Sequence, residues 1–478
     1  MPEWPESCSK LFSSLPCRVM ETLIRASNGR HGDPLNKLLG IPSRFCGKLF
    51  IVKDLSTRAS WVILAIVVLA GLGARVGWGL RQASDDAAID RLPDQREYLL
   101  LGQHLANHDG LWFSDPRFEQ TVLAYRTPGY PILIWLCDAQ AQIVRIAQAV
   151  LDAASIVAIY LLARRWLHPI AALVAAGFVA VNPYMIFFSG LILSETLFTA
   201  MMLWGMVLLV ESGGPWPVEK PKRWMWLGGG LLLALSVLVR PGAIGLPVVL
   251  GAGAALVGDR SPRGHWPMPV MATMILLTAI VLFPWAARNR LELNDWIWTS
   301  TNDGITRYDG FNPNATGASD QRFVQWMPWL SDMSETARSR YLANLADHWI
   351  ADHPLAALQL AVVKIGRTWS PVPLSESYGT RALYWYAGLI FGGMMDALIV
   401  VGLLWGKLPR AVKRFLLLPA LYFTVSAALS VGSLRYLLPA QGSMAILAAA
   451  AMELWLRRRT VVTVTTDGIY AGESGSAV

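Results

Sequence analysis

Long apolar runs separated by polar connections dominate this chain. They predict helices at 59–80, 140–163, 169–187, 191–211, 224–239, 242–257, 267–285, 384–405, 415–432 and 436–456. A helix needs about 20 apolar residues to cross roughly 30 Å of hydrocarbon, and most of the runs approach that length. The two short runs beside Arg240-Pro241 are also compatible with one helix kinked at the proline. The pattern predicts an all-α integral membrane protein with roughly ten to twelve transmembrane helices.

The composition supports this class. Of the 478 residues, 54% are hydrophobic and 15% are charged, whereas a typical soluble domain has about 25% charged residues. A soluble fold with so few charges could not cover its surface with polar side chains. The net charge of +8 does not indicate a nucleic-acid partner, because the basic residues gather beside the apolar runs.

Basic residues mark every second connection between the runs. They are Arg164-Arg165, Lys220, Lys222 and Arg223, Arg260 and Arg263, Lys407, Arg410, Lys413 and Arg414, and Arg457-Arg458-Arg459. Cytoplasmic loops of membrane proteins carry such an excess of lysine and arginine. We therefore expect both termini to lie in the cytoplasm. The ranges 81–139 and 286–383 then lie on the outer face.

The two ends of the chain differ from the apolar part. Residues 1–58 are basic and have no sustained apolar period, which predicts a disordered cytoplasmic tail. The alternative is that translation starts at Met20 or later. Residues 460–478 are expected to form a second tail, and 59–456 the transmembrane domain. The four cysteines, Cys8, Cys17, Cys46 and Cys137, have no metal-ligand spacing and do not indicate a disulfide framework.

The two outer ranges are polar and long enough to hold structure of their own. The range 81–139 is rich in acidic residues, and 286–383 is too long for a bare connection. Within the second range, Ser334 predicts the N-cap of a helix from Glu335 to His348. The range 354–370 predicts an amphipathic helix at the membrane interface. We expect the functional site in a cavity between these two outer ranges.

Short motifs follow the predicted spans in a fixed order. They are Pro93-Asp94 with Glu97-Tyr98, Arg126-Thr127-Pro128-Gly129-Tyr130-Pro131, Leu193-Ser194-Glu195, Val239-Arg240-Pro241, Arg288-Asn289 and Leu434-Arg435-Tyr436. In order and membrane position this set resembles the GT-C glycosyltransferases, above all protein O-mannosyltransferases and lipid A aminoarabinose and galacturonic acid transferases. The resemblance implies a GT-C helical bundle. It also implies inverting transfer of a sugar from a polyprenyl-phosphate donor to a lipid, glycan or protein acceptor on the outer face.

Asp94 is the candidate general base, because it matches the aspartate of that family in its position after the first span. A positioned carboxylate that takes the proton of an acceptor hydroxyl contributes about 10²–10⁴-fold to a rate. Asp85 and Asp86 are the second choice. The competing interpretation is that Asp94 is the N-cap of a helix over Gln95–Asn107.

Four arginines at predicted outer ends of spans are candidates to bind the donor phosphate: Arg126, Arg240, Arg288 and Arg435. Arginine binds phosphate oxygens with two parallel hydrogen bonds and keeps its charge when partly desolvated. The alternative for each is snorkelling to the interface. Glu195 could orient the acceptor, pair with one of these arginines, hold a cation, or stabilise a helix N-terminus.

Other residues carry weaker predictions. By the resemblance, Glu97, Tyr98, Tyr130, Asn289 and Tyr436 are expected to shape the site or contact the acceptor. Arg145 and Asp152 lie on one helix face and predict a structural contact between helices. His104 and His108 have the i, i+4 spacing of a metal pair, but a surface pair is the preferred interpretation. Trp112, Trp326, Trp329 and Trp369 suggest either sugar stacking or an interfacial belt.

The sequence also departs from the aminoarabinose transferases. They carry a Lys-Pro-Pro element where this chain has Arg126-Thr127-Pro128, and a basic residue where it has Glu97. The donor sugar and the head-group contacts are therefore not implied. No metal is required by the sequence, although a divalent metal is not excluded. Two other functions stay open, a flippase or secondary transporter of lipid-linked sugars and an inactive scaffold with the same fold.

Overall fold

The computed structural model describes residues 48–50, 56–213, 223–257, 268–374, 382–459, 461–465 and 468–469. The chain divides into two compact units, Lys53–Leu456 and the two ends Met1–Val52 and Arg457–Val478. Several residues singled out in the sequence lie outside the described part: Met20, Cys8, Cys17, Cys46, Lys220, Lys222, Arg260 and Arg263. Most of the two predicted tails also lies outside it.

The described part of the smaller unit contains three short strands. β1 (Lys48–Phe50) pairs antiparallel with β4 (Val461–Thr465), so that Leu49 faces Val462, and β4 pairs with β5 (Gly468–Ile469). The sequence analysis does not predict these strands.

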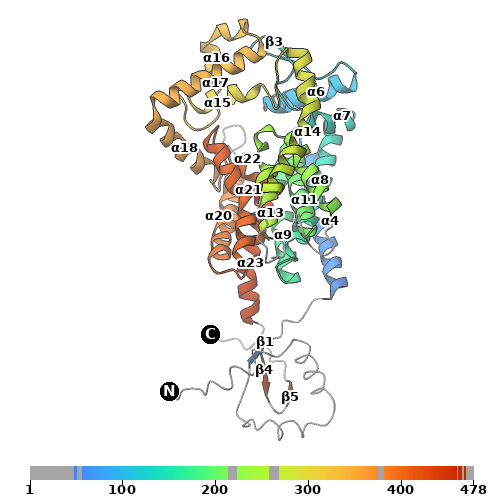
Figure 1. The fold of residues 1–478 in the computed structure, drawn as a ribbon. Helices are drawn as coiled ribbons and strands as arrows, with labels where there is room; N and C mark the ends of the chain where they lie inside the picture. The colour runs from blue at the N-terminus through green and yellow to red at the C-terminus, as the bar shows by residue number, and fades with distance from the viewer. Residues whose placement is uncertain are drawn as a thin grey trace. The chain divides into compact units, whose positions relative to one another are not determined.

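Helices form almost all of the larger unit (Figure 1). Those of span length are α4 (Thr57–Leu80), α8 (Ala141–Ala163), α14 (Met268–Leu293), α20 (Ala382–Trp405), α21 (Arg410–Ala428) and the run Leu434–Leu454. Among the described residues, six helices could therefore cross a membrane by length and composition, or seven with the bent pair α9 (Pro169–Ala180) and α10 (Pro183–Ser189). The shorter helices are α11 (Glu195–Glu211), α12 (Arg223–Val237) and α13 (Leu246–Val257). The prediction of an all-α membrane protein is confirmed, and every predicted range contains helix.

Three spans are broken where the sequence carries proline. Asn182 caps α10 by accepting hydrogen bonds from the backbone N–H groups of Tyr184 and Met185, and α9 and α10 meet at 48°. Pro241 begins the 3₁₀ turn η1 (Pro241–Ala243), so the short pair of apolar runs forms two helices. The last span begins as α22 (Leu434–Leu437) and η3 (Leu438–Ala440) before α23 (Gln441–Arg459). The second break places Arg240 at the N-cap of η1, outside regular helix. The third places Arg435 in the first turn of α22.

The range 81–139 folds into α5 (Asp86–Asp90), α6 (Pro93–Ala106), β2 (Phe113–Asp115), β3 (Gln120–Val122) and α7 (Gly129–Leu136). The range 286–383 contains α15 (Asn302–Gly310), α16 (Phe323–Trp326), η2 (Pro328–Asp332), α17 (Glu335–Asp352) and α18 (Pro354–Thr368). The Ser334 side chain accepts from the N–H of Ala337, which confirms it as the N-cap of α17. α18 is the predicted amphipathic helix, with Leu355 and Leu358 exposed and Lys364 buried.

The two outer ranges share one hydrophobic core. It is built from Leu101, Phe113, Phe118, Val122 and Tyr125 of the first range and from Ile305, Tyr308, Phe311, Phe323, Leu330, Leu342, Ala346 and Ala357 of the second. The Glu335 carboxylate adds polar links, because it accepts hydrogen bonds from the backbone N–H groups of Leu123 and Ala124. The outer ranges therefore form one body at one end of the spans (Figure 1).

Buried charges inside the span bundle are paired or bonded to the backbone. Arg75 of α4 lies 2.6 Å from Asp152 of α8, and both side chains are buried. Arg145 donates to the carbonyl oxygens of Gly190, Gln82 and Ala83. Arg145 and Asp152 thus make structural contacts to neighbouring elements, as their shared helix face predicts.

Candidate active site

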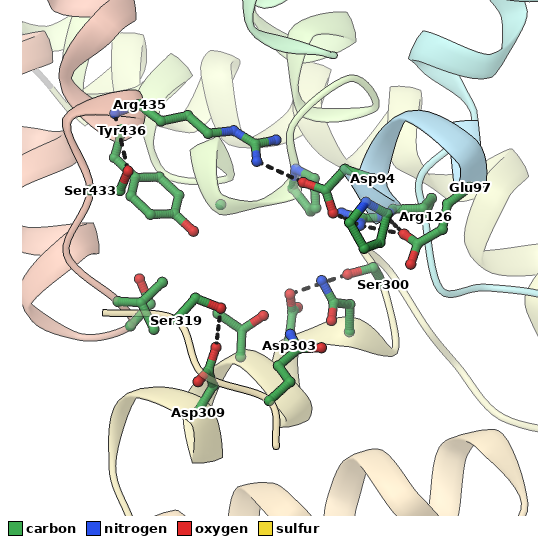
Figure 2. Close-up of a pocket in the computed structure, with 18 of the residues that line it drawn as sticks. Asp94, Glu97, Arg126, Ser300, Asp303, Asp309, Ser319, Ser433, Arg435 and Tyr436 are labelled. Atoms are coloured by element: carbon green, nitrogen blue, oxygen red, sulfur yellow. Dashed lines mark hydrogen bonds and ion pairs between the residues drawn. The ribbon is translucent and has the colours of Figure 1, made fainter. Parts of the chain in front are cut away.

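A cavity of about 2010 Å³ lies where the outer body meets the ends of the spans. Its walls come from α6, the connection before α7, the start of α11, η1, α15, the end of α21 and α22. Figure 2 shows acidic and basic side chains of these elements pointing into the space. Residues of both outer ranges line this cavity, but the ends of the spans also line it, so it does not lie between the two outer ranges alone.

Asp94 lies in the first turn of α6, held between two arginines (Figure 2). Its Oδ1 accepts from Nη2 of Arg126 at 2.5 Å, and its Oδ2 accepts from Nη1 of Arg435 at 2.6 Å. Leu92 occupies the N-cap position, so the interpretation of Asp94 as a helix cap is wrong. Burial raises the pKa of Asp94, but the charges and hydrogen bonds of Arg126 and Arg435 outweigh it and hold the pKa well below its usual range. The two arginines therefore favour the ionised form of Asp94.

Glu97 lies one turn further along α6 and holds Arg126 from the other side. Its Oε2 accepts from Nε of Arg126 at 2.8 Å and also from Nη2 of that arginine. Its Oε1 accepts from Nη2 of Arg117 at 3.1 Å. Burial raises the pKa of Glu97 against the opposing charges of the two arginines. The Arg126 guanidinium thus lies between two carboxylates of the same helix.

Glu195 begins α11 and is completely buried. Its Oε1 accepts a hydrogen bond from Nε of Arg435 and lies 3.2 Å from Nη1 of Arg240. The Arg240 guanidinium also lies over the ring of Tyr436, 5.1 Å from its centre. Of the roles considered for Glu195, the structure shows two: it begins a helix, and it pairs with two arginines.

These contacts join eight charged residues, which we call the ion-pair chain: Arg117, Arg126, Arg240 and Arg435 with Asp94, Glu97, Asp115 and Glu195. With every group ionised, the four positive and four negative charges cancel. An anion that enters the cavity must therefore share the arginines with carboxylates that already occupy them. An incoming anion would compete with these carboxylates for the arginine donors, except at Nη1 of Arg240, which is buried without a hydrogen bond to any described residue.

Arg288 does not join the other three candidate arginines. It donates to the carbonyl oxygens of Leu123 and Leu111, at 2.7 and 2.9 Å, and does not line the cavity. Asn289 beside it is buried and donates to the carbonyl oxygen of Ile297. Both residues hold the outer body together, because backbone carbonyls of the loops take their donors. The structure thus does not support a place for either in the predicted site.

Two further sets of predicted residues lie elsewhere. Tyr130 is buried and donates to Oε1 of Gln148 at 2.5 Å, away from the cavity, whereas Tyr98 and Tyr436 line it. Asp85 caps α5 through the N–H of Ala88. Asp86 is exposed and pairs with Arg96 at 2.7 Å, and neither aspartate lines the cavity. Asp94 therefore has no competitor among the three candidate bases.

The histidine and tryptophan candidates also lie outside the cavity lining. His104 stacks on Trp112 and shares a hydrogen bond with its carbonyl oxygen. Trp369 donates to Oγ1 of Thr424, and Trp326 and Trp329 are exposed. In the described ranges, no group of three or more His, Cys, Asp and Glu side chains is placed to hold a metal ion.

Several cavity residues are not predicted by the sequence. Arg117 forms part of the ion-pair chain, and Asp303, Asp309 and Gln321 also line the cavity. Asp309 accepts from Oγ of Ser319 at 2.6 Å and from the N–H of Asp320 at 2.7 Å, and burial raises its pKa to about 6. Arg117 and Gln321 lie in irregular connections, and Asp303 and Asp309 lie in the short helix α15, where no sequence motif singles them out.

The sequence and the fold were compared with those of known proteins. Residues 129–287 match the family model of dolichyl-phosphate-mannose-protein mannosyltransferases. The archaeal oligosaccharyltransferase AglB of Archaeoglobus fulgidus, in complex with an inhibitory peptide and a dolichol-phosphate, superimposes with a TM-score of 0.51 at 13% identity over 83% of this chain and 50% of AglB. Over the matched part, the chain shares the fold of this oligosaccharyltransferase.

Other comparisons add detail. The apo form of the same oligosaccharyltransferase gives a TM-score of 0.50 at 13% identity, over 82% of this chain and 50% of the other. The chain thus spans about half the length of these enzymes. ArnT of Cupriavidus metallidurans bound to undecaprenyl phosphate gives a TM-score of 0.37 at 12% identity, over 84% and 79% of the two chains. No curated protein matches the sequence.

Proposed function

We propose that this chain is an inverting glycosyltransferase that moves a sugar from a polyprenyl-phosphate donor to a lipid, glycan or protein acceptor. The observation that carries the proposal is the Asp94 carboxylate held between Arg126 and Arg435 in a large cavity at one end of the spans. This transfer requires a base that lies in contact with cations that can bind the phosphate. The match of residues 129–287 to the mannosyltransferase model and the dolichol-phosphate in the AglB complex agree with such a donor.

Each side chain then has a defined role. Asp94 takes the proton of the acceptor hydroxyl while the hydroxyl oxygen forms a bond to the anomeric carbon. The bond from that carbon to the phosphate oxygen breaks, and its electron pair leaves with the polyprenyl phosphate. Attack on the face opposite the phosphate inverts the anomeric configuration. Arg126, Arg240 and Arg435 receive the charge of the leaving phosphate.

The neutral ion-pair chain sets the order of events in this mechanism. In the free protein, two arginines lower the basicity of Asp94. A phosphate that binds Arg126 and Arg435 competes with the carboxylate for their donors. The ion pairs of Asp94 weaken, its basicity rises, and it can accept a proton. Donor binding thus prepares the base before the acceptor reacts.

The alternative of a lipid-linked-sugar transporter has less support. Transporters place their ionisable groups near the middle of the membrane. Here the ion-pair chain lies at the junction of the outer body and the span ends. We propose that this junction faces the periplasm and that the chain lies in the bacterial inner membrane with its termini in the cytoplasm.

Transfer of radiolabelled sugar from a panel of polyprenyl-phosphate donors into total membrane lipid, glycan and protein tests the proposal. Membranes with the wild type are compared with Asp94→Asn, and Asp86→Asn serves as a matched control because Asp86 lies outside the cavity. We expect transfer by the wild type and the control, with Asp94→Asn slower by about 10²–10⁴-fold. Equal transfer by all three would remove Asp94 as the base. No transfer from any donor would reject the proposed function.

A further inference from the structure

The ion-pair chain continues past Asp94 to a contact between the two outer ranges. Arg117 donates to Oδ1 and Oδ2 of Asp115 at 2.8 and 2.7 Å and to Glu97 at 3.1 Å. Its Nη1 donates to Oε1 of Gln321 at 2.6 Å. Its guanidinium also lies over the ring of Tyr125, 4.9 Å from the centre. Two carboxylates, an amide oxygen and a ring thus hold the Arg117 guanidinium, although its side chain remains 25% exposed.

Gln321 is fixed by the segment that carries it, residues 309–321. Asp309 closes this segment on itself through Ser319 and the N–H of Asp320. The carbonyl oxygen of Gly317 accepts from the N–H of Gly432, in the connection that leads to Arg435. One segment of the outer body therefore contacts both flanks of Asp94, the Arg117 side and the Arg435 side.

The position of the Arg126 guanidinium depends on the contacts of Arg117 and Gln321. Glu97 offers Oε2 to Arg126 and Oε1 to Arg117. Without Arg117, the Glu97 carboxylate can rotate about its terminal torsion, and the fork of Arg126 loses its fixed partner. Gln321 supplies the contact that keeps Arg117 pointing at Glu97 instead of only at its near neighbour Asp115.

We propose that Arg117 and Gln321 are positioning residues of this site, which hold Glu97 and thereby orient Arg126 toward the donor phosphate and Asp94. The inference rests on the proposed phosphate site, and it adds a role for the outer segment 309–321 in forming that site. Neither residue needs to contact the reacting atoms. Their effect passes through Glu97.

The test is binding of undecaprenyl phosphate alone to the full-length protein in lipid nanodiscs, followed by transfer kinetics. The variants are Gln321→Leu, Gln321→Glu, Arg117→Met and the double variant Gln321→Leu with Arg117→Met. Gln103→Leu is the matched control, because Gln103 is exposed on α6 and does not line the cavity. Thermal unfolding of each variant is measured in parallel.

We expect Gln321→Leu to weaken binding about tenfold, the loss typical of one hydrogen bond to a charged group. Gln321→Glu keeps an acceptor oxygen in the same place and should retain kcat. If Gln321 acts through Arg117, the double variant binds no more weakly than Arg117→Met alone. Gln103→Leu should bind as the wild type does.

Wild-type affinity in Gln321→Leu would overturn the inference while leaving the proposed function standing. Fully additive losses in the double variant would do the same. Equal loss of kcat in Gln321→Leu and Gln321→Glu would reduce Gln321 to packing and also overturn it. A wild type that binds undecaprenyl phosphate but transfers no sugar rejects the proposed function, while the binding results still decide the positioning role. A wild type that binds no undecaprenyl phosphate overturns both.

Discussion

The charge balance of the ion-pair chain predicts that Asp94→Asn raises the affinity for polyprenyl phosphate while it abolishes sugar transfer. The substitution keeps the shape of the side chain and removes one negative charge between Arg126 and Arg435. Each of these arginines retains a carboxylate partner, Glu97 for the first and Glu195 for the second. The free energy of unfolding should therefore fall by only about 1–2 kcal/mol. Binding of polyprenyl phosphate should become tighter even though transfer is lost.

The magnitude follows from the distances. Asp94 contacts the two guanidinium groups at 2.5 and 2.6 Å, so a phosphate bound to the same groups lies about 4–5 Å from the carboxylate. Two unit charges at this separation repel by about 3–4 kcal/mol at an effective dielectric constant of about 20. The Asp94 side chain is 29% exposed, and solvent screening reduces the repulsion to about 1–3 kcal/mol. Affinity for undecaprenyl phosphate should thus rise about tenfold to a hundredfold.

Titration of undecaprenyl phosphate into nanodisc-embedded protein, followed by tryptophan fluorescence, measures this change. Asp86→Asn removes the same charge from an exposed pair and serves as the control, with an expected change below about twofold. If Asp94→Asn binds no tighter than the wild type, the carboxylate does not compete with the phosphate. The proposed preparation of the base by donor binding would then be wrong.

Three further predictions concern stability. Glu195→Gln leaves two arginines without their buried carboxylate and should lower the free energy of unfolding by about 3–5 kcal/mol, measured by denaturation in detergent. Asp309 has a pKa of about 6 in the fold, above its ordinary 3.8, so the folded state binds its proton more tightly than the unfolded chain does. The unfolding free energy of the wild type, taken relative to that of Asp309→Asn, should therefore fall by about 2–3 kcal/mol as pH rises from about 4 to about 6. Gly310→Ala would bring a Cβ atom within 1.9 Å of a backbone carbonyl in the connection before α22, so it should destabilise by several kcal/mol and lower transfer.

Each of these predictions has a matched comparison. Arg96→Gln breaks an exposed pair and should cost less than about 1 kcal/mol, so an equal loss in Glu195→Gln would contradict the buried pairing. Identical pH slopes in the wild type and Asp309→Asn would assign the slope to other groups. Gly366→Ala adds a Cβ within α18 where no atom lies within 4 Å, and it should stabilise by about 0.5–1 kcal/mol. Equal effects of Gly310→Ala and Gly366→Ala would contradict the close approach at Gly310.

The sequence alone determined the helices and the class of the protein, because both depend on local properties. An apolar run forms a helix in a membrane wherever it lies in the chain, since its backbone groups must be bonded within the segment. The cap of α17 at Ser334 and the break at Pro241 are likewise set by neighbouring residues. The break at Pro183, in contrast, divides a range, 169–187, that the apolar pattern predicts as one helix. Motif order further identified Asp94, Arg126, Arg240 and Arg435 as candidates.

Only the tertiary structure decided which charged residues meet. Asp94 and Arg435 are 341 residues apart, and Arg117 and Gln321 are 204 apart, so no local pattern could pair them. Arg288 resembles the other three arginines in the sequence, yet the folded loops offer it carbonyl oxygens, whereas the others meet carboxylates. Each long side chain binds the partner that the packing of the outer body brings within its reach. The ion-pair chain is for this reason a property of the fold. The sequence could identify several of its residues as candidates but could not predict their contacts.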